Sequence, residues 1–439
     1  MFKTLINAFK NPETRNKILI TVGLLLLFRL GCWMPIPGID YSVAATVVGG
    51  NDSLLSLLSA ITGDALANGA FLAIGISPYI NASIIIQLLT VAIPKLESWS
   101  KQGDEGRKKI NLVTRLVTLA LAIVQSVGIV ISWANANAIH TAIFAGSFLE
   151  TEWVLCVFVA LSLVAGSMFT MWLGDRITEK GVGNGISLLI YIGILSTVVL
   201  SLIANVTEIV KGNWYAVWEL VCFLGMAVLI FGFIVFVDLA ERRIPVQYAK
   251  QIKGRKQYGG QSTFIPLKVN ASGVLPIIFA SAIITFPQII AQIVAPGTDF
   301  YRWWTEYLGA GSWGYSILLA ALILGFSYFY AQIQFNPEEV ARNIQQYGGF
   351  IPGIRPGPQT YDYLKKVTKR ITFFGALYLM IIALIPSLLF SLLNELGTGA
   401  LVNAMTSTGM LIVVSVALEF DKQLQSLMMM KHYKGFLSK

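Results

Sequence analysis

Long apolar runs recur along this chain, and they limit its fold more than any other feature of the sequence. A hydrocarbon core about 30 Å thick is crossed by about 20 helical residues. Hydrophobic residues make up 55% of the chain and charged residues only 13%, whereas soluble chains average about 25% charged residues. The pattern predicts an all-α integral membrane protein. Its ten predicted transmembrane helices lie at about 18–36, 71–93, 112–133, 153–173, 186–204, 217–238, 271–295, 315–334, 371–393 and 400–418.

Lysine and arginine residues are concentrated on one predicted side of the membrane. An even number of spans places both ends of the chain on the same side. Of the 32 Lys and Arg residues, only Lys211 and Arg302 fall on the opposite side and only Arg29 lies near mid-span, which leaves 29 on the terminal side when charges at span edges are counted with it. Because cytoplasmic loops carry an excess of Lys and Arg, we expect a multi-pass protein of the cell membrane with both termini cytoplasmic. Anionic lipid headgroups explain this basicity better than nucleic acid does.

The first apolar run and the cysteines have simple interpretations. The run is too long for a cleaved signal peptide, and no small-x-small cleavage site follows it. Cys32, Cys156 and Cys222 lie within or beside the runs without metal-like spacing. We expect them to pack as small apolar side chains.

The second run contains residues that lipid does not favour. In IGISPYINASIIIQLLT (74–90), Pro78 is expected in the second turn, and Asn81, Ser83 and Gln87 follow it. A polar group buried in hydrocarbon needs a partner. We therefore expect this helix to face more than lipid.

The stretch LLSLLSAITGDALANGA (54–70) lies just before that run. It is too short and too polar to cross the membrane, yet too apolar to lie free in water. Two interpretations remain open. The segment is either a short helix in a water-filled cavity or an interfacial helix on the outer leaflet.

Two cytoplasmic connections, 239–270 and 335–370, are far longer than the two to eight residues that usually join bundle helices. Both contain several aromatic residues, which disordered segments rarely have. We expect structured docking surfaces there. The outer connection near 205–216 is a natural hinge between two halves of five spans.

The chain lacks the usual chemistry of an enzyme. It has only two histidines, His140 and His432, and no GxxxxGK[ST] phosphate-binding loop, so we expect no catalytic site, metal or cofactor. Ion-coupled carriers place acidic residues inside their spans, and these spans contain almost none. Arg29 is the one charge near mid-span, and we expect it to bond backbone carbonyls between helices.

Several motifs are specific to one family. They are FRLGCWMPIPGID (28–40), LAIGISPYINASIIIQLLT (72–90), MWLGDRITEKGVGNGIS (171–187), QSTFIPLKVNASGVLPIIFA (261–280), FNPEEVARNIQQYGGFIPGIRPGPQT (335–360) and MLIVV (410–414). By these blocks, in this order, the chain resembles the SecY family of protein-conducting channels. The resemblance implies two pseudosymmetric halves around a pore, 1–210 and 211–439, with a short plug helix at about 55–68.

The resemblance also implies roles for individual residues. The pore ring would comprise Ile76, Ile80, Ile186, Ile190, Ile278 and Ile412. The plug would include Leu57, Leu58, Ile61 and Leu66. Outside the family context, an isoleucine stripe in a membrane helix more often faces lipid or core than a pore.

A lateral gate between spans 2–3 and 7–8 would be lined by Asn81, Gln125 and Phe286. An ordinary interhelical hydrogen bond is an equally good interpretation of Gln125. Docking to a SecA motor or a ribosome would use Lys250, Lys253, Arg255, Lys256 and Arg355. The alternative for these cations is a solvated charge run.

The implied partners are SecE- and SecG-like membrane subunits, the SecA motor, the ribosome, signal peptides, nascent secretory or membrane proteins, and anionic lipids. Two other functions compete with a channel. A small-solute secondary transporter would need intramembrane acids, and a scaffold for other membrane helices would need no plug or ring. The sequence favours the channel.

Overall fold

The computed structural model describes single positions 9 and 59 and ten longer ranges, which are 11–48, 62–139, 151–248, 251–253, 256–258, 262–271, 273–294, 299–309, 312–394 and 407–437. A helix lies at each of the predicted apolar runs. These helices are α2 (Pro12–Gly31), α5 (Ser77–Ala92), α7 (Asp104–Asn135), α8 (Glu152–Lys180), α9 (Gly185–Val210), α10 (Trp214–Asp238), α11 (Leu275–Val294), α13 (Trp313–Gln334), α15 (Pro358–Asn394) and α16 (Ser407–Leu437). Shorter helices are α3 (Tyr41–Val48), α6 (Pro94–Lys101), α12 (Asp299–Leu308) and α14 (Pro337–Gln346).

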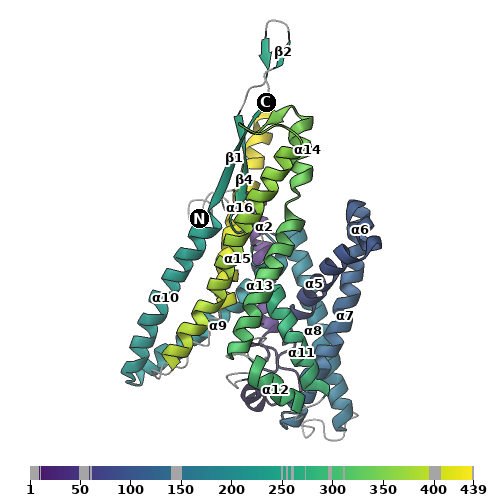
Figure 1. Cartoon of the computed structure of the whole chain (residues 1–439). Coiled ribbons are helices and arrows are strands. Elements are labelled where there is room, and N and C mark those ends of the chain that lie inside the picture. Colours follow the sequence, from purple (N-terminus) through teal and green to yellow (C-terminus); the bar gives the residue numbers. More distant parts are fainter. Residues whose placement is uncertain are drawn as a thin grey trace.

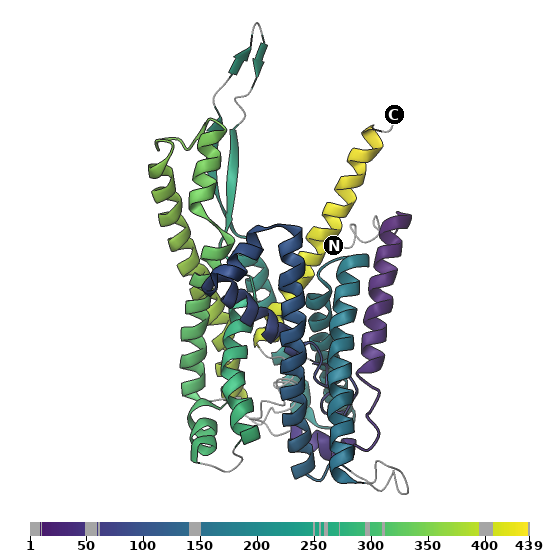
Figure 2. The ribbon, with the colours of Figure 1, turned by 90° about the vertical axis from the view of Figure 1, so that its right-hand side faces the viewer.

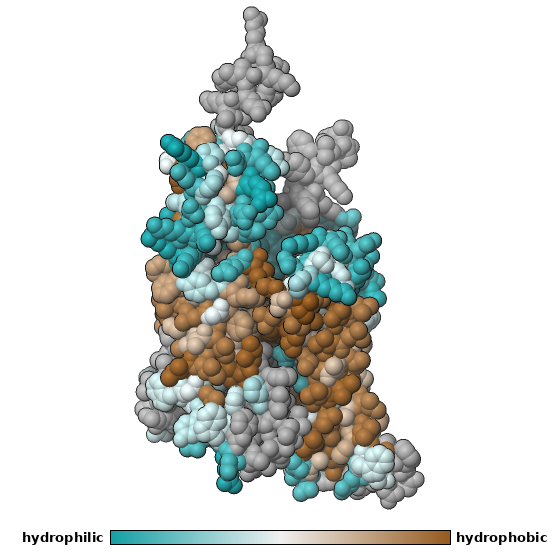
Figure 3. All heavy atoms as spheres, turned by 45° about the vertical axis from the view of Figure 1, so that its right-hand side comes forward, coloured by the Kyte–Doolittle hydropathy of each residue, from teal (hydrophilic) through white to brown (hydrophobic). Residues whose placement is uncertain are grey.

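Long apolar helices give the molecule the form of a membrane bundle. Among the described residues, six helices are long and apolar enough to cross a bilayer, or seven if the α5–α6 pair, bent by 100°, counts as one span. On the face seen in Figure 3, an apolar belt crosses the middle of the molecule between two hydrophilic ends. The all-helical membrane class is confirmed, and the count of ten spans stays a prediction.

The long connections are structured, as predicted. β1 (Glu241–Tyr248) pairs antiparallel with β4 (Ser262–Lys268) and with β5 (Gly349–Phe350), in the order β4-β1-β5. A small core joins this sheet to α14 and the first turns of α15, and it includes Ile244, Leu267, Ile344 and Leu364. We call the sheet, α14 and the start of α15 the cap. It stands on one end of the bundle (Figure 1), and a second hairpin, β2 (Gln251–Lys253) with β3 (Lys256–Tyr258), extends beyond it.

The second predicted connection is shorter than the sequence suggested. α15 begins at Pro358 rather than near 371, so it carries its polar first turns out of the apolar belt and into the cap. The predicted boundary followed hydropathy alone. A helix does not end where its sequence becomes polar if a second core, here that of the cap, supports it.

Pro78 does not lie in the second turn of a helix, as the sequence had suggested. α5 begins at Ser77, and the residues before it form turns, with Gly75 at a φ of +59°. Proline in the first turn of a helix removes no hydrogen bond, because that N–H has no intrahelical partner in any case. Pro78 therefore starts the helix and does not distort it.

The irregular stretch before α5 is packed against α8 at Gly166. A methyl group added at Gly166 would lie 1.9 Å from the carbonyl oxygen of Phe71. A contact that short is not sterically allowed, so the position requires glycine. Gly225 on α10 is also helical, but a methyl group there would meet nothing within 4 Å.

We expect Gly166→Ala to destabilise the protein by about 1–3 kcal/mol, because the added methyl group forces α8 away from the backbone of Phe71. Gly225→Ala is the matched control, and alanine there should be neutral or stabilising by up to about 1 kcal/mol. Thermal unfolding in detergent, followed by circular dichroism, measures both. Equal midpoints for the two variants would contradict the packing described at Gly166.

Candidate functional site: an isoleucine cluster at the centre of the bundle

Six isoleucines from four helical segments meet in one apolar cluster at the centre of the bundle. Ile76 and Ile80 come from the start of α5, Ile186 and Ile190 from α9, Ile278 from α11 and Ile412 from α16. Three of them, Ile76, Ile190 and Ile412, are at most 7% exposed, and the other three pack against them. The structure thus brings together all six residues of the predicted ring.

The segment that precedes α5 contributes to the same cluster from one side. Ala65, Ala70 and Leu72 are fully buried in it. Leu66 is also fully buried, in a neighbouring cluster around Trp133. Residues 62–70 therefore lie inside the protein, which excludes the outer-leaflet interpretation for this part.

The described part of the predicted plug is mainly a series of turns, not a helix. Leu57, Leu58 and Ile61 lie outside the described residues. The residues that follow α2 supply hydrogen-bond partners for the backbone of this segment. The N–H of Ile36 donates to the carbonyl of Gly69 (2.9 Å), and the N–H of Phe71 donates to that of Met34 (2.8 Å).

Arg29 also fastens this segment to α2. Its Nη1 donates to the carbonyl oxygen of Gly63 at 2.7 Å, and its guanidinium lies 5.6 Å from the ring centre of Trp33. Gly63 has a φ of +70° and touches Arg29 closely, so a side chain has no room there. The predicted structural role of Arg29, bonded to backbone carbonyl, is confirmed.

Asp64 stands beside this contact in partly buried surroundings. Burial raises the pKa of its carboxyl, while a 3.4 Å hydrogen bond from the Ser59 hydroxyl and the charge of Arg29 lower it. The segment thus carries both a cation contact and an acid within the bundle. Neither its polarity nor its turns fit a lipid-facing helix.

A pocket of about 570 Å³ opens beside the cluster, between α5, α6, α7 and α13. Tyr79, Ser83 and Gln87 of α5 line it together with Asn111 and Thr114 of α7. Ser83 and Gln87, which looked unsuited to a membrane helix, therefore face this pocket. This outcome agrees with the expectation that α5 faces more than lipid.

The three predicted gate residues are spread around this region. Asn81 is half-buried on α5, and Gln125 is buried on α7, where its Oε1 has no hydrogen-bond partner among the described residues. Phe286 lies on α11, and its side chain is outside the described set. α11 contacts both α5 and α7. No interhelical hydrogen bond through Gln125 Oε1 is present in the described part of the chain.

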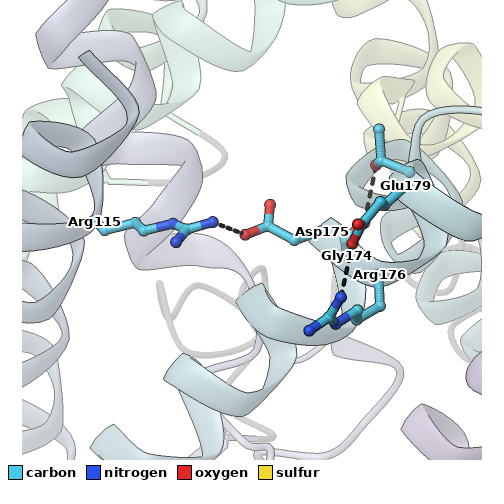
Figure 4. A network of polar contacts seen from close by, with 6 residues as sticks. Arg115, Gly174, Asp175, Arg176 and Glu179 are labelled. Atoms are coloured by element: carbon cyan, nitrogen blue, oxygen red, sulfur yellow. Dashed lines mark hydrogen bonds and ion pairs between the residues drawn. The ribbon is translucent and has the colours of Figure 1, made fainter. Parts of the chain in front are cut away.

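Figure 4 shows two ion pairs that the sequence did not predict, one between α7 and α8 and one within α8. Arg115 Nη2 lies 2.6 Å from Asp175 Oδ2, and Arg176 Nη1 lies 2.7 Å from Glu179 Oε2. The side chains are well exposed, so each pair stabilises the fold by at most about 1 kcal/mol. Sixty residues separate Arg115 from Asp175, and no spacing rule connects such positions.

Of the predicted docking residues, the described ones, Lys253, Lys256 and Arg355, lie on or beyond the cap. Arg355 is exposed in a turn held by the Thr360 hydroxyl, which donates to the Arg355 carbonyl at 2.9 Å. Lys253 and Lys256 face each other in the β2–β3 register. Lys250 and Arg255 lie outside the described residues. In the part of the chain that the structure covers, no group of three or more His, Cys, Asp or Glu side chains could hold a metal.

Comparison with known proteins identifies sequence relatives along the whole chain. The family model for SecY matches residues 70–420. The chain is 42% identical to the protein translocase subunit SecY of Streptomyces coelicolor over 443 residues, with full coverage of both chains. It is also 42% identical to that of Corynebacterium glutamicum over 447 residues, which covers 99% of each.

Solved structures share the fold at lower identity. A protein-conducting channel superposes with a TM-score of 0.60 and 20% identity, covering 94% of this chain and 92% of the other. A SecY structure that concerns the plug domain gives 0.61 and 18%, with the same coverage. Sec61 in the canine ribosome-channel complex gives 0.59 and 18%, again covering 94% and 92%.

We expect Arg29→Met to loosen residues 62–70, because the Gly63 carbonyl loses a charged donor whose hydrogen bond is worth about 1.5–3 kcal/mol. Amide hydrogen exchange in detergent should become faster in that segment. Arg15→Met, at the exposed start of the same helix, is the control and should leave the segment unchanged. If the two variants exchange alike, Arg29 does not hold the segment in place.

Proposed function

This chain belongs to the SecY family of protein translocase subunits, which are protein-conducting channels and not enzymes, and we propose that it forms the central channel of a Sec translocon. The observation that carries the proposal is the isoleucine cluster. Its members come from α5 and α9 in one half of the chain and from α11 and α16 in the other. A contact made by both halves is where a pore between them would close.

The chemistry of isoleucine suits a seal for a polypeptide channel. A collar of branched apolar side chains excludes water from a narrow pore and so blocks ions. It offers no fixed polar group, so it can yield to any side chain that passes. We propose that Ile76, Ile80, Ile186, Ile190, Ile278 and Ile412 form this ring in the closed channel.

The buried segment before α5 is proposed as part of the plug. Its described residues pack beneath the isoleucines through Leu72 and neighbouring alanines. Its turns and its Arg29 contact make it a separate piece that can move without unwinding a spanning helix. A related SecY structure concerns a plug domain that stabilises the closed state, and we propose the same role here.

The lateral gate is proposed between α5–α7 and α11–α13, where the first half of the chain meets the second (Figure 2). The pocket between α5, α6, α7 and α13 supports this position. Asn81, Gln125 and Phe286 would line the gate. The hinge would be the α9–α10 connection at Lys211–Asn213. The halves 1–210 and 211–439 would then separate at the lateral gate, away from this hinge.

Partners are proposed at the cap. The canine relative is part of a ribosome-channel complex, and the exposed Arg355 of this chain suits a phosphate contact to ribosomal RNA, which positions but does not read sequence. Lys250, Lys253, Arg255, Lys256 and Arg355 would dock a ribosome or a SecA-like motor. SecE- and SecG-like subunits and anionic lipids would complete the assembly, with both termini cytoplasmic on the cap side.

We expect simultaneous replacement of Ile80, Ile190 and Ile278 by glycine to make the closed channel leak ions, because the narrowest point becomes wide and wet. The matched control replaces Ile123, Ile203 and Ile283, which face outward at 39–56% exposure. Both triple variants lose similar helix propensity. Single-channel recording in planar bilayers should show long-lived conductance for the first variant only.

The plug could mask the leak, so the same recording is made with residues 57–67 deleted as well. If the variant that lacks both ring side chains and plug stays silent while it is still inserted, the ring assignment is wrong. The family membership would be unaffected.

We expect Arg355→Glu to reduce motor-driven translocation into reconstituted vesicles by at least about tenfold, since the reversed charge repels the phosphates or acidic groups of a docked partner. Arg302→Glu makes the same charge change at an exposed position of α12, which lies at the end of the bundle opposite the cap (Figure 1), and serves as the control. A wild-type rate for Arg355→Glu would exclude Arg355 from docking.

A further inference from the structure

Three separate parts of the chain meet at the carboxylate of Asp238, the last residue of α10. Asn270 Nδ2, just after β4, donates to Asp238 Oδ1 at 2.8 Å. Ser415 Oγ, on α16, donates to Asp238 Oδ2 at 3.1 Å. One carboxylate oxygen of Asp238 therefore binds Asn270, next to the cap. The other binds Ser415 on α16, the helix that carries Ile412.

The cap side of this junction is held firmly. The N–H of Val269 donates to the carbonyl of Ala240 at 3.0 Å, which continues the β1–β4 ladder down to the membrane helices. A methyl group at Gly375 of α15 would lie 2.4 Å from the Val269 carbonyl, so this turn is pressed against α15. Asn270 is 6% exposed, and its Oδ1 has no hydrogen-bond partner among the described residues. Displacement of the sheet must therefore move the Asn270 amide that binds Asp238.

The membrane side leads directly to the isoleucine cluster. Ser415 lies three residues, about one helical turn, after Ile412 on α16. Residues three apart lie on the same face of a helix. Leu411 and Val414 pack into the core that α16 shares with α11 and α15. A shift of α16 at Ser415 is therefore also a shift of Ile412, because the helix moves as a stiff element.

The Ser415 hydroxyl has a second possible partner, a backbone carbonyl of its own helix, as any helical serine has. Serine in a helix can donate to the carbonyl four residues earlier, as Ser201 of α9 does to Thr197 at 2.9 Å. When Asp238 is displaced, the Ser415 hydroxyl can turn to its own helix without remaining unpaired. The Ser415 hydroxyl thus has two possible hydrogen-bond partners, so α16 can shift without leaving this hydroxyl unpaired.

We propose that Asp238 is a positioning residue that couples partner docking on the cap to the position of Ile412. This coupling rests on the proposed function of the ring and of the cap. Docking would pull on β1 and β4, move Asn270 relative to Asp238, and release α16 from its closed position. The carboxylate takes no part in the passage of the polypeptide itself.

The first test measures coupling within the isolated full chain and needs no transport. Asn270→Ala should speed amide hydrogen exchange at residues 412–416 about tenfold, since α16 loses part of its fixed support. Coupling is reciprocal, so Ser415→Ala should speed exchange at 268–271. Ser415→Thr, which keeps the hydroxyl, and Ser201→Ala, whose hydroxyl bonds only its own helix carbonyl, should match the parent. Unchanged exchange at either remote segment would overturn the proposal.

The second test asks whether the coupling is used. The readout is the ratio of motor-stimulated to unstimulated translocation in vesicles, with motor affinity and unfolding temperature measured beside it. Ser415→Ala and Asn270→Ala should each lower the ratio at least about threefold at unchanged affinity, and the double variant should fall no further because both act through Asp238. Ser415→Thr should restore it. A normal ratio in both single variants, or a fall that tracks lost stability, would overturn the positioning role.

Failure of the proposed function gives a different result. A parent protein that carries no polypeptide under any condition would contradict the channel. The exchange experiment would still decide whether Asp238 couples cap and helix.

Discussion

Peptide groups at membrane depth have no water to bind, and each must find its hydrogen-bond partner inside the protein. The helices meet this constraint within themselves, but the segment at 62–76 cannot. Its backbone is paired to Met34 and Ile36, its Gly63 carbonyl is bound by Arg29, and α8 lies against it at Gly166. The helices around this irregular segment meet at the isoleucine cluster, where side chains and not backbone groups make the contacts.

We propose that the seal of the channel lies at this isoleucine cluster. Isoleucines from four helical segments hold it by dispersion and burial alone, with no ion pair or directional bond among them. Contacts of this kind reform after displacement, and their strength does not depend on one geometry. The polar interactions lie elsewhere: at the Arg115–Asp175 pair, at the Arg29 contact and at Asp238.

The cap shows why some sequence expectations needed correction. Hydropathy placed the start of one span near 371, but α15 continues back to Pro358 because cap residues such as Ile344 cover its first turns. It likewise placed Pro78 within a helix, whereas α5 starts only at Ser77. In both cases an apolar count located the helix but not its first residue, which contacts with the cap extend in α15 and Pro78 marks in α5. The Arg115–Asp175 pair escaped prediction for the same reason, since nothing local links the two positions.

The sequence by itself determined the class of the protein, because runs of about twenty apolar residues admit only spanning helices. Charge asymmetry predicted its orientation, family motifs named the six isoleucines, and the lone mid-span arginine implied a backbone partner that the structure identifies as Gly63. Only the tertiary structure decided that the six isoleucines lie in one apolar cluster, that residues 62–70 lie inside rather than on the membrane surface, and that Asp238 accepts hydrogen bonds from both Asn270 and Ser415. Periodicity and composition act over one or two helical turns, whereas the two Asp238 hydrogen bonds join residues 32 and 177 positions apart. Contacts of this kind depend on how whole helices pack.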